Sequence, residues 1–338
     1  MTSPDFSTVS LVTGFLGSGK TTLMRELLRD PALKDAAVIV NEFGEIGLDH
    51  QLMESNSQKP VLLESGCICC TLDGSLVETL ENLHRQRRSG TVPPFRNVLI
   101  ETTGLAEPAP IIHELFDNRA VRLGFTLNRV ITLVDAVNGW TTLDRHEVAV
   151  RQAALADTIL VSKTDLAPTD AVERLMSRIS VINPIARLLR VEKGQSNNEA
   201  LWHRLDDPIV GEMTGWSELS HRAMRPSHDG HSAHHDHDRI ATAAVRLTTP
   251  ISLAPFSAWL EQAIAAYGDD LLRIKGILNI EGRTRPVVIH GVQRVFHPPV
   301  ELNAWPDSDR TSRLILILHD IEPNGLIRSL RQALASRE

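Results

Sequence analysis

The stretch that decides the fold is Gly14-Phe15-Leu16-Gly17-Ser18-Gly19-Lys20-Thr21, near the start of the chain. It fits the pattern G-x-x-x-x-G-K-[ST], in which glycines let backbone N–H groups turn inward around an anion. An apolar run, Ser10 to Thr13, comes directly before it, and a segment of helical composition, Thr21 to Arg29, comes directly after it. A strand before and a helix after are the context that the motif requires, because the helix N-terminus adds its dipole to the loop. The sequence therefore predicts a phosphate-binding loop, or P-loop.

Individual residues of this loop have predicted roles. The Lys20 ammonium would reach the β- and γ-phosphates of a nucleotide, and the Thr21 hydroxyl would bind Mg²⁺. We assign nucleotide binding to Gly14, Gly17, Ser18, Gly19, Lys20, Thr21 and Thr22.

Outward from the loop, apolar runs of strand length alternate with segments of helical pattern. The predicted strands are Ser10 to Thr13, Ala37 to Val40, Val61 to Leu63, Asn97 to Ile100, Val130 to Val134 and Thr158 to Val161. Helical patterns between them include Leu76 to Arg88, Val148 to Ala156 and Ala171 to Ile179. Strands separated by helices predict an α/β fold, here a doubly wound, mostly parallel P-loop NTPase sheet.

The alternation stops near residue 205. Residues 206–240 are polar and rich in His, Asp, Gly and Ser, which is typical of a linker or a mobile loop. Strand and helix patterns then resume and end in a helical segment from Asn324 to Ala335. We predict a P-loop domain over residues 1–205, a His-rich linker over 206–240 and a smaller α+β domain over 241–338.

Composition and charge exclude several classes of function. The length of 338 residues suits two domains. The net charge is −7 with no basic stripe, which argues against nucleic-acid binding. No apolar run is long enough to cross a membrane, and the N-terminus does not have the pattern of a signal peptide. We therefore expect a cytosolic protein that has neither nucleic acid nor membrane as a partner.

A second set of nucleotide residues follows the apolar run Asn97 to Ile100. Glu101 comes directly after this run, and Gly104 follows three residues later. Open α/β sheets bind ligands at the carboxyl ends of their strands, which is where this carboxylate is expected. Glu101 could hold Mg²⁺ through water, and the Gly104 N–H could meet the γ-phosphate. We predict Lys20, Glu101 and Gly104 as the catalytic set.

The segment Ser162-Lys163-Thr164-Asp165, after the run Thr158 to Val161, is similar to the [NTS]-K-x-D motif of guanine recognition. The Asp165 carboxylate can accept hydrogen bonds from guanine N1–H and the 2-amino group, whereas adenine has no donor there. The methylene stem of Lys163 would lie along the base plane. We assign base binding to Ser162, Lys163 and Asp165, which favours GTP over ATP.

All three cysteines, Cys67, Cys69 and Cys70, lie within four residues. An odd number in one cluster is not a disulfide framework, and in a reducing cytosol it indicates a metal or redox site. Thiolates bind Zn²⁺ and similar ions, and zinc takes four ligands. Cys67 and Cys69 would share one side of an extended segment, and a turn could bring Cys70 round. Three sulfurs leave a fourth position open, which suits a metal that must be released.

The segment Asn41 to His50 occupies the place in the chain of a GTPase switch region, which the γ-phosphate and Mg²⁺ order. Its glutamates, Glu42 and Glu45, could bind Mg²⁺, position water or ligate the thiol-bound metal. The residue types alone do not decide among these three roles.

Together these segments resemble the CobW family of metallochaperone GTPases. The resemblance is carried, in chain order, by Gly14 to Thr22, Asn41 to Asp49, Gly66 to Cys70, Glu101 to Pro108 and Ser162 to Asp165. In the C-terminal part, Arg273-Ile274-Lys275-Gly276 and His290-Gly291-Val292 are similar to the smaller domain of that family.

The resemblance implies a slow GTPase that uses GTP and Mg²⁺, binds Zn²⁺ or Co²⁺, and delivers the metal to a client metalloprotein. It implies metal ligation by Cys67, Cys69 and Cys70, with Glu42 as a further ligand. No glutamine follows Gly104, so the residue that orients the hydrolytic water is left open. The open metal position could also be completed across a homodimer.

A third, weaker metal signal is the tract of His228, His231, His234, His235 and His237, which could collect metal for the cysteine site or could be a solvated linker.

Three alternative functions stand beside the zinc chaperone. The cargo could be cobalt or iron, for cobalamin synthesis or nitrile hydratase, because cobalt and zinc accept the same thiolates. The chain could be a small-molecule kinase with a structural zinc, or a zinc store or sensor with weak GTPase activity.

Overall fold

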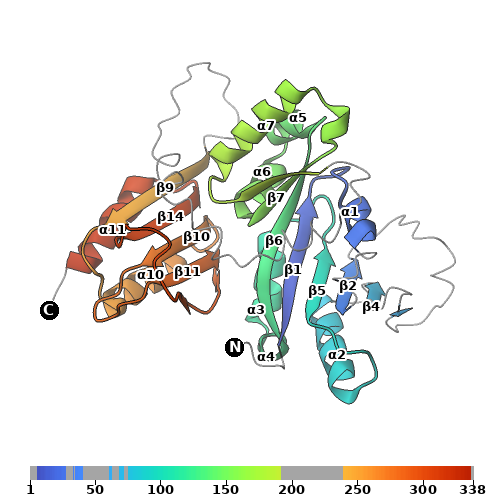
Figure 1. The fold of residues 1–338 in the computed structure, drawn as a ribbon, viewed down its shortest axis with the longest axis horizontal. Helices are drawn as coiled ribbons and strands as arrows, with labels where there is room; N and C mark the ends of the chain where they lie inside the picture. Colours follow the sequence, from blue (N-terminus) through green and yellow to red (C-terminus); the bar gives the residue numbers. More distant parts are fainter. Residues whose placement is uncertain are drawn as a thin grey trace. The chain divides into compact units, whose positions relative to one another are not determined.

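The computed structural model describes residues 6–27, 33, 35–40, 61–62, 68–71, 75–191 and 239–335, and for residues 61–62 and 68–71 it describes the backbone alone. The chain forms two compact units, each built around a sheet of its own. Figure 1 shows the strands of both sheets. Among the described residues no helix is both long and apolar enough to cross a membrane.

The first unit contains a sheet of eight strands in the order β3-β4-β2-β5-β1-β6-β7-β8. Strand β1 pairs in parallel with β5 and β6, β2 pairs in parallel with β4 and β5, and β6 pairs in parallel with β7. Strand β3 pairs with β4 in the antiparallel direction. The predicted mostly parallel sheet is therefore confirmed. The bounds are β1 Ser7–Gly14, β2 Ala36–Val40, β3 Val61–Leu62, β4 Ile68–Thr71, β5 Asn97–Glu101, β6 Phe125–Asp135, β7 Thr158–Ser162 and β8 Arg187–Val191.

Strand β1 lies inside the sheet and carries the P-loop at its carboxyl end. Seven of its eight residues are buried, as expected for a strand covered on both faces. Helix α1, Lys20–Leu27, follows the loop and buries Leu23, Met24 and Leu27 in the core. Because β5 and β6 flank β1 on opposite sides, the segments that leave these two strands emerge beside the P-loop.

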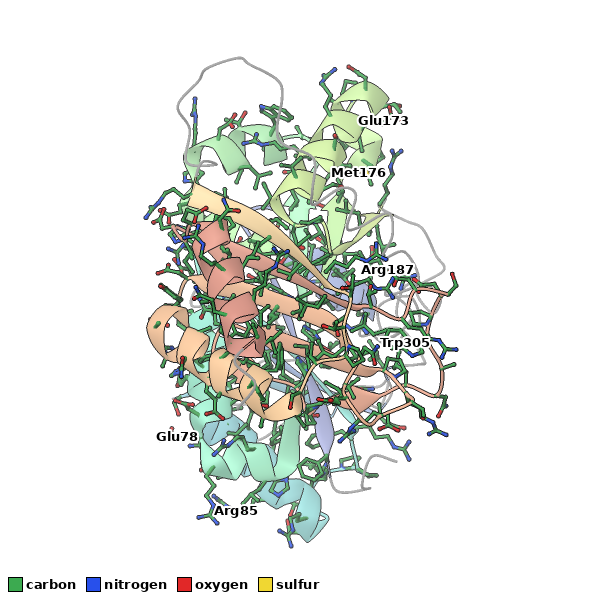
Figure 2. All side chains as sticks on the ribbon, turned by 90° about the vertical axis from the view of Figure 1, so that its left-hand side faces the viewer. Glu78, Arg85, Glu173, Met176, Arg187 and Trp305 are labelled. Atoms are coloured by element: carbon green, nitrogen blue, oxygen red, sulfur yellow. The ribbon has the colours of Figure 1, made fainter. Side chains whose placement is uncertain are left out.

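Helix α2, Leu76–Ser89, shows how local sequence sets the ends of an element. The Glu78 N–H donates to Ser75 Oγ at 3.1 Å, and the Ser75 N–H donates to Glu78 Oε2 at 3.3 Å, which forms a capping box. At the other end Gly90 adopts φ 71°, a left-handed conformation that glycine tolerates best. Figure 2 shows Glu78 and Arg85, both on this helix, at the periphery of the molecule.

Several elements were not predicted. Helix α3, Pro108–Asp117, begins with two prolines in its first turn, where a missing N–H costs no helical hydrogen bond. Helix α4, Arg119–Gly124, is too short for a periodic pattern to be visible. Strand β4 runs from Ile68 through Thr71, so the chain stays extended at Cys70 and the turn expected there is absent from the described backbone.

The second unit contains an antiparallel sheet in the order β12-β11-β10-β14-β9, with β13 pairing to β11. Helices α10 and α11 cover one face, as Figures 1 and 2 show, and bury Phe256, Trp259, Leu326 and Leu330 there. The predicted smaller α+β domain is confirmed. Its elements are β9 Ile240–Leu247, α10 Leu253–Tyr267, β10 Leu271–Leu278, β11 Val287–Val292, β12 Val295–Phe296, β13 Val300–Glu301, β14 Ser312–His319 and α11 Pro323–Ala335.

Three helices from the middle of the chain group with this second unit, namely α5 Gly139–Arg145, α6 Glu147–Leu155 and most of α7 Thr169–Ile182. Polar contacts join α6 to the antiparallel sheet. Arg273, which is fully buried, donates from Nη1 to the Leu155 carbonyl at 2.7 Å. His319 lies between Glu147 and Asp270, at 3.1 and 3.0 Å from their carboxylate oxygens. Polar side chains thus join α6 to strands β10 and β14.

Candidate functional site

The P-loop has the backbone shape that an anion nest requires. Gly14, Gly17 and Gly19 all have positive φ, at 139°, 73° and 96°. A Cβ atom at Gly14 would lie 2.4 Å from the Leu133 carbonyl oxygen of the neighbouring strand β6, so both conformation and space demand glycine there. The Leu23 N–H donates to the Gly19 carbonyl at 3.0 Å, which starts the helix directly at the loop. The loop, with a helix N-terminus at its end, is suited to phosphate.

Lys20 places a buried positive charge against this loop. The residue is only 7% exposed, and Nζ donates to the carbonyls of Gly14 at 2.8 Å and Phe15 at 3.2 Å. Both carbonyls belong to the loop itself, so the ammonium lies where the glycine-rich backbone turns. This position agrees with the predicted contact between Lys20 and the phosphates.

The two predicted Mg²⁺ residues are brought together. Thr21 Oγ1 donates to Glu101 Oε1 at 2.8 Å, although the two residues are 80 positions apart in the chain. The parallel register pairs Val12 with Glu101, and the Thr102 N–H donates to the Val12 carbonyl at 3.0 Å, which fixes the carboxylate beside the P-loop. Glu101 is 1% exposed. A hydroxyl and a carboxylate are oxygen ligands of the kind that Mg²⁺ prefers, so the pair fits this ion.

Gly104 packs directly on the P-loop. A Cβ atom at this position would lie 2.6 Å from Leu16 Cδ2 and 2.8 Å from the Leu16 backbone. Any larger residue would push this segment away from the loop. The structure therefore places the Gly104 backbone next to the phosphate-binding loop, as the predicted γ-phosphate contact requires.

The guanine-recognition segment is tied to the P-loop through a hydroxyl. Ser162 ends strand β7, and its Oγ donates to the Ser18 carbonyl at 2.7 Å. Lys163 follows in a left-handed conformation, with φ 58° and ψ 33°. Asp165 lies exposed on the short 3-10 helix η3, Thr164–Leu166. The three predicted base-binding residues thus lie on one turn that contacts the phosphate loop.

Sequence reasoning missed Asp135, which ends strand β6. Its Oδ2 accepts a hydrogen bond from Lys163 Nζ at 2.8 Å, and its Oδ1 accepts one from the Val137 N–H at 2.8 Å. Burial opposes ionisation of this carboxyl, but the bonds from Lys163, Asn138 and Val137 and the Lys163 charge outweigh it and hold its pKa below the ordinary value. An acid at the carboxyl end of a buried strand was the available signal, because the same rule singled out Glu101.

The cysteine segment is placed by its backbone. In strand β4, Cys69 lies opposite Val38 of β2 and Val61 of β3, and Cys70 lies opposite Ile39 of β2. Cys67, Glu42 and the histidines from His228 to His237 lie outside the described residues. Of the predicted metal ligands, the structure therefore locates only Cys69 and Cys70, through the backbone of β4.

The register of β2 relates the cysteine strand to the Mg²⁺ residues. Val40, the last residue of β2, pairs with Thr71 of β4 on one side and with Glu101 of β5 on the other. Neighbouring strands lie about 4.8 Å apart, so the end of the cysteine strand and Glu101 are two spacings, or about 10 Å, apart. The chain leaves β2 between them and continues into the segment that contains Glu42.

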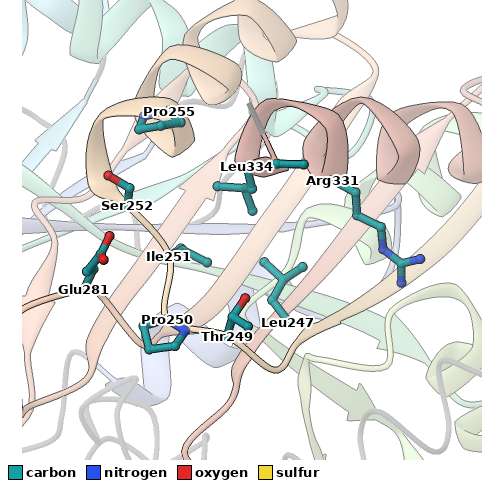
Figure 3. Close-up of a pocket in the computed structure, with 10 residues that line it drawn as sticks. Leu247, Thr249, Pro250, Ile251, Ser252, Pro255, Glu281, Arg331 and Leu334 are labelled. Carbon is teal, nitrogen blue, oxygen red and sulfur yellow. The ribbon is translucent and has the colours of Figure 1, made fainter. Parts of the chain in front are cut away.

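A cavity of about 570 Å³ opens in the second unit (Figure 3). Its walls come from the end of β9, the start of α10 and the end of α11. None of its residues belongs to the predicted nucleotide or metal set, so it is not part of this site. The lining includes Leu247, Ile251, Pro255, Glu281, Arg331 and Leu334.

Comparison with known proteins matches two successive regions of the chain to family models. Residues 8–190 match the family described as CobW/HypB/UreG, nucleotide-binding domain, and residues 240–334 match the cobalamin synthesis protein cobW C-terminal domain. The zinc chaperone YjiA of Escherichia coli K12 is 32% identical over 313 residues, which cover 91% of this chain and 93% of that protein. The zinc chaperone CobW of Pseudomonas aeruginosa is 30% identical, with 97% of this chain and 91% of that protein covered.

Solved structures of the same overall fold are known. The crystal structure of Zn(II)-bound YjiA GTPase from E. coli has a TM-score of 0.70 and 27% identity, and the match covers 98% of this chain and 99% of that one. A Zn(II)-bound triple mutant of YjiA GTPase has a TM-score of 0.73. With both of its parts matched, this chain belongs to the CobW/HypB/UreG family, with the nucleotide-binding domain followed by a CobW C-terminal domain.

Proposed function

We propose that this chain is a GTP-hydrolysing zinc chaperone of the cytosol, which binds Zn²⁺ at Cys67, Cys69 and Cys70 and delivers it to a client metalloprotein. The observation that carries the proposal is the position of strand β2 between the cysteine strand β4 and the Glu101 strand β5. The segment that leaves β2 starts between the nucleotide site and the cysteine strand. A change at one site can therefore reach the other through a short piece of chain.

The nucleotide half of the function rests on described contacts. The P-loop backbone and Lys20 bind the β- and γ-phosphates, and Gly104 brings a second backbone segment against the same loop. Thr21 and Glu101 would hold Mg²⁺, which would supply positive charge against the phosphates. Asp165 selects guanine. Because no glutamine follows Gly104 to orient water, intrinsic hydrolysis is slow.

The metal half rests on ligand chemistry and on the relatives. Thiolates with one open position suit a metal that is handed on, and Glu42 is the proposed further ligand. Two relatives that align over more than nine-tenths of this chain are named zinc chaperones, which supports Zn²⁺ as the cargo. Thiolate ligands alone accept Co²⁺ as well, so Co²⁺ is the alternative cargo to be tested.

In the proposed cycle the nucleotide controls the fourth position of the metal site. Mg-GTP draws the segment after β2 towards the phosphates and brings Glu42 to the thiolates. Hydrolysis removes the γ-phosphate contact, Glu42 leaves, and the client takes the ion from a three-thiolate site. The His228 to His237 tract serves as a looser site that supplies metal.

A competition titration tests the coupling. Zn²⁺ and, separately, Co²⁺ are titrated against a chelator with Mg-GDP or with a non-hydrolysable GTP analogue. Coupled sites shift each other's affinity by roughly 5- to 150-fold, and we expect tighter zinc binding with the analogue. Lys20→Ala, which removes a phosphate contact, should abolish the shift. Equal affinities in both nucleotide states would refute a nucleotide-gated carrier and favour a zinc store or sensor instead.

A further inference from the structure

Asp135 is held rigidly beside the guanine-recognition segment. It pairs in register with Ser162, and the Ala136 N–H donates to the Ser162 carbonyl at 2.8 Å. Besides the bond from Lys163, its carboxylate accepts hydrogen bonds from the Val137 N–H at 2.8 Å and from Asn138 Nδ2 at 3.1 Å. The side chain is 9% exposed. Its oxygens are therefore fixed by the turn that follows β6, independently of Lys163.

Lys163 is fixed at both ends. Its backbone adopts the left-handed conformation that few non-glycine residues occupy, and its carbonyl accepts from the Leu166 N–H at 3.0 Å. Its Nζ lies 2.8 Å from Asp135 Oδ2, and the lysine side chain remains 35% exposed. The four methylene groups lie between these two fixed points, and the partly exposed side chain leaves room for a base to pack on it.

We infer that Asp135 is a positioning residue for guanine nucleotides, which holds the Lys163 stem in place for the base before the nucleotide arrives. This inference rests on the proposed guanine-nucleotide activity. A lysine that is free in solution loses rotamer freedom when a base packs on its stem, and an anchored lysine has already lost it. Asp135 acts through Lys163 and does not contact the base itself.

A purely structural role makes a different prediction. Asp135 also caps the Val137 and Asn138 amides, so its loss could disturb the turn and weaken binding without involving Lys163. In that case the effect of changing Asp135 would persist after the lysine ammonium has been removed. A double-mutant cycle separates these two roles.

The experiment measures GDP and ADP affinity by calorimetry for the full chain, Asp135→Asn, Lys163→Met and the double variant. Met keeps an apolar stem without the ammonium. Immobilising one long side chain is worth a factor of roughly 3 to 10 in affinity, so each single variant should bind GDP that much more weakly. The double variant should be no weaker than either single one. Asp144→Asn, which removes the 2.5 Å ion pair to Arg178 on α7, is the matched control and should bind GDP like the unmodified chain.

Unchanged GDP affinity in Asp135→Asn would overturn the inference, as would losses that multiply in the double variant. If Asp135→Asn does not fold, Lys163→Met decides, because wild-type affinity without the ammonium would show that the anchor has no effect. Failure of the proposed function gives a different result. An unmodified chain that binds ADP as tightly as GDP would refute guanine selectivity, whatever Asp135 does.

Discussion

Thr21 and Glu101 share a hydrogen bond of 2.8 Å between Oγ1 and Oε1, and the carboxylate is almost completely buried. This bond joins the first turn of α1 to the end of β5 and draws the hydroxyl and carboxylate oxygens together at the P-loop. In many buried pairs of this kind the hydroxyl serves only as a hydrogen-bond donor to the carboxylate. Here the sequence predicts that both residues bind Mg²⁺, Thr21 from the P-loop pattern and Glu101 from its place at the carboxyl end of a strand near that loop.

We therefore expect Glu101→Gln to lower the rate of GTP hydrolysis by about 100-fold, the size of effect seen when one group that stabilises transition-state charge is removed. The amide can keep a bond to Thr21 but loses the charge that holds Mg²⁺ through water. Phosphate release measured over a range of Mg²⁺ concentrations checks this. Glu107→Gln, at the start of α3, removes the charge of a carboxylate outside the predicted Mg²⁺ pair and is the control. If Glu101→Gln hydrolyses GTP with the same dependence on Mg²⁺ concentration as the unmodified chain, the assignment of Glu101 to Mg²⁺ is contradicted.

Gly104→Ala should disturb the phosphate site through packing alone. The added Cβ would lie 2.6 Å from Leu16 Cδ2 and 2.8 Å from the Leu16 backbone, so one of the two segments must move. We expect weaker binding of a GTP analogue and a loss of about 1–3 kcal/mol in the free energy of unfolding. Gly325→Ala, where the new atom meets nothing closer than 3.5 Å, should change neither quantity by much. Wild-type analogue binding in Gly104→Ala would argue against this contact.

Changes in the cysteines and in the histidine tract should affect zinc binding in different ways. Replacing Cys69 with Ser removes a thiolate and should weaken Zn²⁺ binding by at least about 100-fold. GTP hydrolysis should continue in this variant, because Cys69 lies on β4, which does not pair with the P-loop strand β1. Deleting residues 228–237 should lower the number of zinc ions bound but preserve the difference between the GDP and GTP-analogue states. The reverse pattern, with the tract carrying the nucleotide-dependent site, would refute the proposed cycle.

Stability should depend on pH through His297. Its ring stacks on His290 with centroids 4.3 Å apart, and its buried Nε2 has no hydrogen-bond partner among the described residues. Burial, together with the charges of Arg273 and Lys275, lowers the pKa of His297 from 6.5 to about 3. The unfolded chain therefore takes up this proton first as the pH falls. The stability associated with the neutral ring is complete above pH 6.5 and is lost progressively between pH 6.5 and about 3.

The variant His297→Phe keeps a stacked ring but cannot titrate. Between pH 6.5 and 5 the free energy of unfolding of this variant should fall less steeply than that of the unmodified chain, and the difference in slope should approach about 1.4 kcal/mol per pH unit near pH 5. Urea unfolding at several pH values measures the slopes. His113→Gln, an exposed histidine on α3, is the matched control. Parallel slopes in His297→Phe and the unmodified chain would show that the buried imidazole does not set the pH response.

Most elements of both units follow from local sequence. The strand before the P-loop, the helix after it and the apolar runs that became β2, β5, β6 and β7 could be predicted because apolar periodicity and glycine patterns are local properties. For β4 the sequence predicted an extended segment through Cys69, but the turn expected at Cys70 was wrong, because the prediction there followed the metal-ligand pattern. Helix α3 was not predicted because its first turn contains prolines, which are more often found in loops and turns than inside helices.

The sequence by itself determined the residue types of the site: a glycine-rich loop with Lys20 and Thr21, an acid at the end of β5, a guanine-type segment that begins at the end of β7 and three thiols within four residues. Only the tertiary structure decided which of these meet. The Thr21–Glu101 bond, the contact of Gly104 with Leu16 and the Lys163–Asp135 pair all join segments that are far apart in the chain. Their meeting depends on the order and register of parallel strands, which are set by packing between distant segments and leave no local pattern in the sequence.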